Sequence, residues 1–133
     1  MRHFTPEEAN AELEHVRPLV EQLVATRVEH TAALERQEEL EAKIRGNGGG
    51  IPPAELAQAT AEVDAVARRL ARLVDEITEH GAQVKDLDSG LVDFPALHEG
   101  ETVLLCWQLG EDEIAWWHHE EDGFAGRRPL PLD

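Results

Sequence analysis

The stretch GNGGGIPPAELAQATAEVDAVARRLARLVDEITEHG, residues 46–81, carries the signals that decide the fold. Glycines open it, Pro52 and Pro53 suit the first turn of a helix, and Gly81 suits a left-handed C-terminal cap. Between them, apolar residues recur at alternating spacings of three and four, the pattern of a helix that packs along a seam. The stretch therefore predicts a flexible turn followed by a long helix. The apolar positions of this helix are Leu56, Ala59, Val63, Val66, Leu70, Leu73 and Ile77.

Another helix is predicted before the glycine-rich turn. Thr5 suits its N-cap and Pro6 its first position, and Glu8 lies where it can complete a capping box with Thr5. Pro18 lies inside the helical pattern, so we expect it to kink the helix or to make it restart. The sequence thus predicts a long first helix with one irregular point.

A short turn between two helices makes them antiparallel, and the chain lengths then set their overlap. Both helices rise by about 1.5 Å per residue, so we count equal numbers of residues away from the turn along each of them. By this count His80 at the end of the second helix comes level with about residue 17 of the first. The first helix therefore overhangs its partner, and we expect residues 6–17 to pack on the segment that follows Gly81.

The region after Gly81 changes to the pattern of short strands. Runs rich in β-branched and aromatic residues alternate with turn-forming segments such as Asp88-Ser89-Gly90. Connections this short favour an antiparallel meander. The tail from Gly123 to Asp133, which holds two prolines, is expected to be irregular. The expected strands cover residues 83–87, 91–94, 102–108 and 113–117.

The predicted fold class is α+β: a long antiparallel helical hairpin (residues 1–81) followed by a small antiparallel β-meander (residues 82–133). We expect the meander to pack as one domain with the overhang of the first helix. A two-helix hairpin buries only one stripe per helix and cannot fill a core alone. We therefore expect a homodimer in which two hairpins form an intersubunit four-helix bundle. The expected oligomer seam consists of Val63, Val66, Leu70, Leu73 and Ile77.

Composition narrows the class of protein. The 133 residues include 28 acidic and 12 basic side chains, a formal net charge of −16. Such a chain lacks the clustered Lys and Arg that nucleic acids require, and it repels anionic membranes. The first residues show no apolar segment of an export signal, and the lone Cys106 excludes an internal disulfide. We therefore expect a cytoplasmic protein that binds neither nucleic acid nor membrane.

Residues 82–125 hold 11 acidic side chains and one base, Lys85. One interpretation is a solvated acidic surface that keeps the protein soluble. The other is a cation site, because Asp86 and Asp88 share one face of a strand and a hairpin can bring Asp93 close. Oxygen ligands of this kind suit Mg²⁺, Mn²⁺ or Ca²⁺. Asp88 is also a good residue to initiate a turn.

A histidine extends this candidate site. His118 and Glu120 are two residues apart, so on a strand they face the same side. A histidine with carboxylates can bind Zn²⁺, Mn²⁺ or Fe²⁺, and surface residues at the end of a strand are the alternative interpretation. The candidate cofactor is a divalent cation. The metal hypothesis names Asp86, Asp88, Asp93 and His118.

Three further residues can carry chemistry. Cys106 lies in an apolar run and is interpreted as a small buried hydrophobe. Acidic surroundings raise the pKa of a thiol, which argues against a catalytic cysteine. Lys85 and Arg127 can each hold an anion or form a salt bridge, and Lys85 can also tune the charge of a cation site.

Several segments resemble the bacterial DUF2203 family. The similarity spans nearly the whole chain, and KDLDSGLVDFP, residues 85–95, is its most specific part. The start of the chain and residues 105–107, 109–111, 117–118 and 123–127 contribute as well. The resemblance implies a small cytoplasmic bacterial protein and brings no established function. The positions to which it points are Lys85, Asp86, Asp88, Asp93, His118 and Arg127.

Two functions of different classes follow from these observations. A non-enzymatic, oligomeric helical-hairpin interaction module is favoured by the seam and by the lack of a recognisable catalytic motif. The alternative is a divalent-metal-binding protein with its site on the acidic β region. As a hydrolase, that protein would depend on a metal-activated water, because the sequence shows no nucleophile paired with a base.

Overall fold

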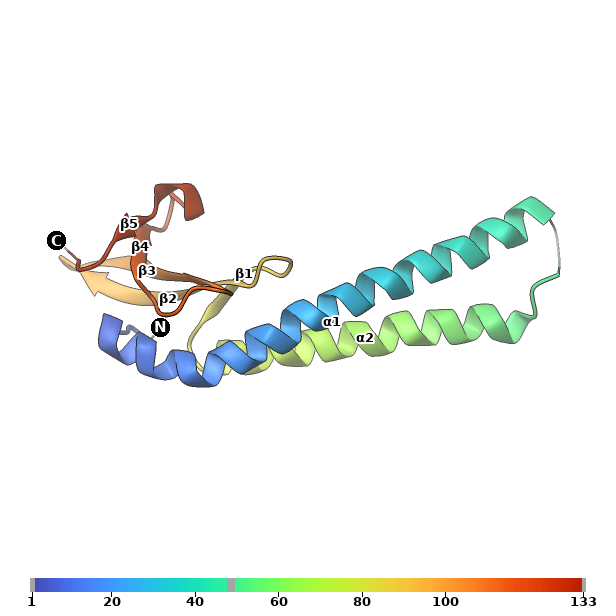
Figure 1. Cartoon of the computed structure of the whole chain (residues 1–133), viewed down its shortest axis with the longest axis horizontal. Coiled ribbons are helices and arrows are strands. Elements are labelled where there is room, and N and C mark those ends of the chain that lie inside the picture. Colours follow the sequence, from blue (N-terminus) through green and yellow to red (C-terminus); the bar gives the residue numbers. More distant parts are fainter. Residues whose placement is uncertain (1, 48–49, 133) are drawn as a thin grey trace.

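The computed structural model describes residues 2–47 and 50–132. Two long helices form an antiparallel hairpin, and a five-stranded antiparallel meander lies beside the N-terminal part of the first helix (Figure 1). The rest of the hairpin projects from the sheet, and we call this part the arm. The helical hairpin and the antiparallel meander together confirm the predicted α+β fold. The helices are α1 (Pro6–Asn47), α2 (Pro53–Glu79) and the short 3₁₀ helix η1 (Phe124–Gly126). The strands are β1 (Gln83–Asp86), β2 (Leu91–His98), β3 (Glu101–Gln108), β4 (Trp116–His119) and β5 (Arg128–Pro129).

The start of α1 has the predicted capping box. The Thr5 amide donates to Glu8 Oε1 at 2.9 Å, and the Glu8 amide donates to the Thr5 hydroxyl oxygen at 3.1 Å. Each side chain thus satisfies one of the amides that a helix start leaves without a partner. Hydrogen bonding from the Thr5 backbone amide, and after it from the Thr5 side chain, lowers the pKa of the Glu8 carboxyl.

Removal of this cap is expected to lower stability measurably. Thr5→Ala should cost about 1 kcal/mol of unfolding free energy, because the Glu8 amide loses its acceptor. For a chain of this length that corresponds to a fall of about 3–5 °C in Tm, measured by circular dichroism. Thr31→Ala is the control, since Thr31 is exposed inside α1 and alanine is the better helix former. A Tm of Thr5→Ala equal to that of the control would contradict the role of the cap.

Two irregular points of the hairpin differ in part from the prediction. Pro18 does not make α1 restart, because α1 is continuous from Pro6 to Asn47, and its axis bends in the blue first third (Figure 1). The glycine-rich turn begins later than expected, since Gly46 and Asn47 still belong to α1. Residues 48 and 49 of that turn lie outside the described part of the chain.

The apolar seam of α2 packs within the chain. Val66, Leu70 and Ile77 are buried against α1, and Val63 and Leu73 are partly buried. A single chain therefore already buries most of this seam. The main argument for a homodimer was that the seam needs a second chain to cover it, and that argument is weakened. The homodimer itself stays a prediction. The α1 residues buried along the hairpin include Val16, Val20, Leu23, Thr26, Ala33 and Leu40.

The predicted overhang exists and is shorter than expected. In the arm, the side-chain amide of Gln37 donates to the Thr60 hydroxyl. This contact agrees with the register that would bring His80 level with about residue 17. At the base, however, His80 Nδ1 lies 2.6 Å from Glu12 Oε1 rather than level with residue 17. The bend of α1 accounts for this shift, because it carries the first turns of α1 across the end of α2 (Figure 1).

The first turns of α1 pack on the sheet, as predicted. Their buried side chains share one core with the strands, and Asn10 fixes the loop before β4 from both sides. Its amide group donates to the Ile114 carbonyl at 3.3 Å, and its carbonyl oxygen accepts from the Ile114 amide at 2.8 Å. The core includes Phe4, Leu13, Val16, Val92, Phe94, Leu105, Trp107 and Trp117.

Two strands differ from their predicted bounds. β2 was expected to end at Phe94 but continues to His98, and a two-residue turn, Glu99-Gly100, connects it to β3. Both turn residues have positive φ, 52° and 79°, as the tight turns of β-hairpins require. β4 spans 116–119 instead of 113–117, because the preceding residues form the loop that is bound to α1.

Pro95 lies inside β2 without breaking the sheet. β1 pairs with β2 only as far as Asp93, so Pro95 has a strand partner on one side, Leu104 of β3. A proline is tolerated where no neighbouring strand needs its missing N–H. Its carbonyl accepts a hydrogen bond from the Phe4 amide at 2.7 Å, which joins the chain start to β2.

The C-terminal tail is more regular than predicted. It contains η1 and the two-residue strand β5, which pairs with β4 through Trp116 and Trp117. The tail therefore closes the open edge of β4 and passes over the sheet. None of the described helices combines the length and the apolar content that a membrane crossing requires.

Candidate metal centre

The two faces of the sheet have different roles. Along each strand successive side chains point to opposite faces, and one set, with Val92, Leu105 and Trp117, belongs to the core shared with α1. The alternate set, with Asp93, Cys106 and His118, faces the other side, where η1 and the loops around it lie. This outer face is the only place among the described residues where Asp, Cys and His side chains gather within metal-binding distance of one another.

Three adjacent strands supply the cluster, one residue each. Asp93 of β2 pairs directly with Cys106 of β3, and His118 of β4 pairs with Leu104, two residues from Cys106 on the same face. One ligand atom from each of the three lies within 4.8 Å of the other two. All three side chains are buried, with exposed fractions of 2% for Asp93, 0% for Cys106 and 3% for His118. We refer to Asp93, Cys106 and His118 as the Asp–Cys–His cluster.

The ring of His118 is oriented by its own backbone. Its Nδ1 lies 2.7 Å from the carbonyl oxygen of His119, and a carbonyl only accepts, so Nδ1 carries the hydrogen. In the neutral ring Nε2 is then an acceptor, and it lies 3.3 Å from both carboxylate oxygens of Asp93. Acceptors that face each other need a proton or a cation between them. The cluster is therefore incomplete without a positive species.

The thiol of Cys106 is held in its neutral form when no metal is bound. Burial raises its pKa to about 12, and the nearby Asp93 carboxylate adds to the effect. This agrees with the sequence-based argument that Cys106 is not a free nucleophile. A bound metal ion reverses this preference, because a coordinating thiol is deprotonated.

A cavity of about 110 Å³ reaches the cluster. Asp93 and His118 line it, and so do Lys85 of β1 and Glu120, which follows β4. Apolar side chains complete the wall: Leu91, Leu104 and Phe124. The cluster is thus buried yet adjacent to space that a small ligand can enter.

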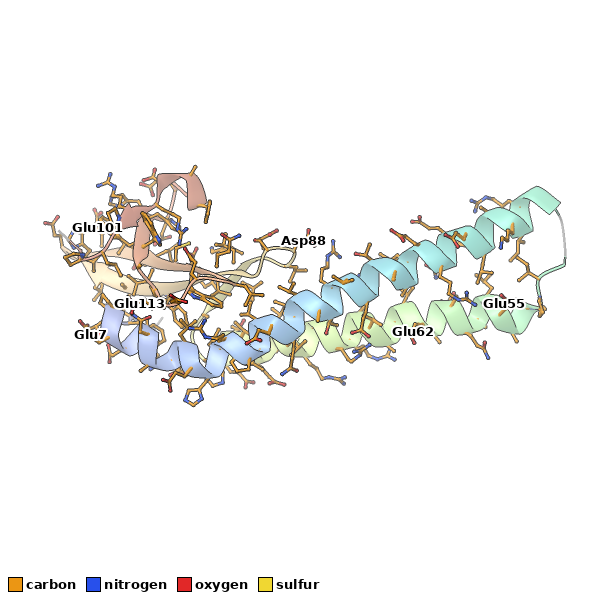
Figure 2. The ribbon with its side chains drawn as sticks, viewed as in Figure 1. Glu7, Glu55, Glu62, Asp88, Glu101 and Glu113 are labelled. Carbon is orange, nitrogen blue, oxygen red and sulfur yellow. The ribbon has the colours of Figure 1, made fainter. Side chains whose placement is uncertain are left out.

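Asp86 and Asp88 do not join Asp93 and His118. The Ser89 amide and hydroxyl donate to Asp86, and these bonds lower the pKa of the Asp86 carboxyl. Asp88 lies at the turn between β1 and β2, where Figure 2 labels it, and forms an ion pair with Arg27 of α1 at 3.1 Å. Both carboxylates are exposed, and they serve the turn and its contact with α1.

Arg127 forms a salt bridge, one of the two roles expected for it. Its Nη2 donates to both carboxylate oxygens of Glu111 at 2.8 Å, and its guanidinium stacks on Phe124 and Trp116. Arg127 therefore holds η1 against the sheet. The positive charge lies close enough to Cys106 to offset part of the rise in its pKa.

Sequence reasoning did not identify Cys106 as a candidate ligand. It was interpreted as a buried hydrophobe, and burial alone agrees with that interpretation. The signal that would have found it is the two-residue turn Glu99-Gly100, since this turn fixes the register that places Cys106 opposite Asp93.

The fold and the cluster together define a class of protein: a helical hairpin that supports a small antiparallel sheet with an Asp–Cys–His cluster on its outer face. The sequence profile described as "Uncharacterized conserved protein (DUF2203)" matches residues 2–130. The chain belongs to this family, which confirms the resemblance noted from the sequence. No curated protein and no solved structure matches the chain.

Proposed function

We propose that the protein binds one transition-metal ion, with Zn²⁺ as the preferred ion, at the Asp–Cys–His cluster. The observation that carries this proposal is that Nε2 of His118 lies 3.3 Å from both carboxylate oxygens of Asp93, in a buried place beside the Cys106 thiol. Thiolate, imidazole and carboxylate are the side-chain ligands of Zn²⁺, whereas Mg²⁺ and Ca²⁺ prefer oxygen alone. The protein is therefore proposed to be a zinc-binding member of its family.

The separation between ligand atoms supports a metal over a direct ion pair. Charge-assisted N–H···O bonds are about 2.7–2.9 Å long, so 3.3 Å between Nε2 of His118 and each Asp93 oxygen is long for one. Ligand atoms about 2.0–2.1 Å from one metal ion, at tetrahedral angles, are about 3.3–3.4 Å apart. The His118 Nδ1–H bond to a backbone carbonyl is also the support that metal-binding histidines commonly have.

The charge around the sheet favours uptake of a cation. Residues 82–125 carry 11 acidic side chains and one base, Lys85. Figure 2 labels Glu101 and Glu113 at the end of the molecule that holds the sheet, and Asp88 on the turn of the sheet that faces the arm. The negative electrostatic potential of these side chains raises the local concentration of cations.

Elemental analysis of protein purified without chelators tests the proposal. We expect about one zinc per chain in the purified parent protein, whereas Cys106→Ala and His118→Ala should bind zinc too weakly to retain it through purification. Asp86→Ala and Asp88→Ala are matched controls that should keep the metal, because both carboxylates are exposed and lie outside the cluster. Zinc at about 100 times its Kd should add about 2.7 kcal/mol to the stability of the parent protein. Metal-free protein whose Tm does not respond to added Zn²⁺, Mn²⁺ or Fe²⁺ would overturn the proposal.

A second candidate function is an oligomeric interaction module built on the arm of the hairpin. Its support is that the arm projects from the sheet (Figure 1) and that Val28 on its α1 side is 66% exposed. Light scattering at micromolar concentration tests it. Twice the mass of the chain in the parent protein and a smaller mass in Val28→Asp would support the module, and a mass of one chain in both would reject it.

A further inference from the structure

Lys85 occupies a special position in the sheet. Val84 pairs with Val92 and Asp86 pairs with Leu91, so Lys85 is an extra residue of β1 without a partner on β2. Such a bulge redirects a side chain, and bulges are frequent beside active sites. Lys85 lines the cavity next to the Asp–Cys–His cluster, and no other Lys or Arg of the described chain does so. The bulge therefore places an exposed lysine at the rim of the cavity that adjoins the proposed metal site.

The cavity limits what can bind beside the metal. Its volume of about 110 Å³ is well below the roughly 300–1,000 Å³ of sites for drug-sized ligands. A nucleotide or a sugar is therefore excluded, whereas a ligand of a few non-hydrogen atoms fits. The apolar part of the lining is formed by Leu91, Leu104 and Phe124, and it suits a hydrogen or a methyl group.

The proposed zinc would have an open position toward this cavity. Three protein ligands and one exchangeable ligand are the arrangement of zinc sites that take up small molecules. The Cys106 thiolate and the Asp93 carboxylate neutralise the two charges of the ion, so the ammonium of Lys85 supplies attraction for an anion. Glu120, also at the cavity, opposes it and keeps that attraction moderate.

We propose that the cavity binds a small monocarboxylate, of the size of formate or acetate, between the metal and Lys85. One carboxylate oxygen takes the open metal position, and the other accepts a charge-assisted hydrogen bond from the Lys85 ammonium. The apolar wall receives the rest of the ligand. This inference rests on the proposed zinc site, and it names the class of ligand that the site would take.

The visible spectrum of the Co²⁺-substituted full-length protein separates the two proposals. Absorption bands of four-coordinate cobalt with a thiolate ligand report the metal site itself. We expect acetate to shift these bands with a saturable titration in the parent protein. Lys85→Met should weaken acetate binding about tenfold or more, since a hydrogen bond to a charged group is lost. Glu120→Gln should tighten it several-fold, because the opposing charge is removed.

Lys43→Met is the matched control, because the chain has two lysines and Lys43 lies on the exposed arm. It should bind acetate as the parent does. Cobalt bands that acetate does not move, or equal acetate affinities in Lys85→Met and Lys43→Met, would overturn the monocarboxylate inference and leave the metal site intact. Absence of the cobalt bands would overturn both.

Discussion

In metal-free protein, His118→Leu is expected to lower the free energy of unfolding by about 3–5 kcal/mol. The substitution leaves the Asp93 carboxylate, 2% exposed, without the ring that faces it. Burial of a charge without its partner is among the most destabilising changes known in proteins. Urea denaturation at pH 7 with a chelator present measures the effect.

The double variant Asp93→Val/His118→Leu should recover most of this loss. Two apolar side chains of suitable shape replace a buried polar pair at little cost, and valine suits a strand. We therefore expect a coupling energy of about 3 kcal/mol between the two positions, measured by a double-mutant cycle. The double variant should be more stable than His118→Leu alone.

The Glu12–His80 pair provides a control cycle within the same chain. It likewise joins a carboxylate to a histidine, at 2.6 Å, yet the side chains of Glu12 and His80 are 21% and 37% exposed. Water screens such a pair, so its coupling energy should stay below about 1 kcal/mol. A coupling between Asp93 and His118 no larger than this control would show that the cluster does not need a positive species between its acceptors.

The helices could be predicted from the sequence because their signals are local. The capping box at Thr5 and the spacing from Leu56 to Ile77 depend on neighbours one to four residues away. The overlap of the helices at their base depends on the bend of α1, and nothing in the spacing fixes that bend. The contact of Gln37 with Thr60 therefore agrees with the predicted register of the two helices, whereas the contact of His80 with Glu12 does not.

The candidate site depends on strand register, which is not local. The sequence predicts that β2 ends at Phe94 and that β3 begins at residue 102. A connection of seven residues does not fix which residues of the two strands lie opposite each other. β2 continues past Pro95 because β1 does not pair with it there, so no neighbouring strand needs the missing N–H. The sequence brings Asp93 near through the hairpin at Ser89-Gly90 and offers His118 through its spacing and the family resemblance, and only the true register adds Cys106 and removes Asp86 and Asp88.

The affinity of the protein for zinc should rise about tenfold for each pH unit between pH 7 and pH 9. The pKa of the Cys106 thiol in the metal-free protein is about 12, so the thiol carries its proton throughout this range. A zinc-bound thiol carries none. Binding therefore releases the thiol proton, in addition to any proton held between Asp93 and His118, and mass action favours the bound state as protons become scarcer. Over two pH units the Kd should fall about 100-fold, measured by competition with a chromophoric chelator calibrated at each pH.

Cys106→Ala tests whether the released proton comes from this thiol. The variant keeps Asp93 and His118, so it should bind zinc more weakly, and its affinity should change about tenfold less per pH unit than that of the parent protein. The same tenfold slope in Cys106→Ala would assign the proton to another group, and a flat profile in the parent protein would remove Cys106 from the ligand set. With Cys106 as a ligand, the burial that keeps the free thiol protonated is also what makes metal uptake depend steeply on pH.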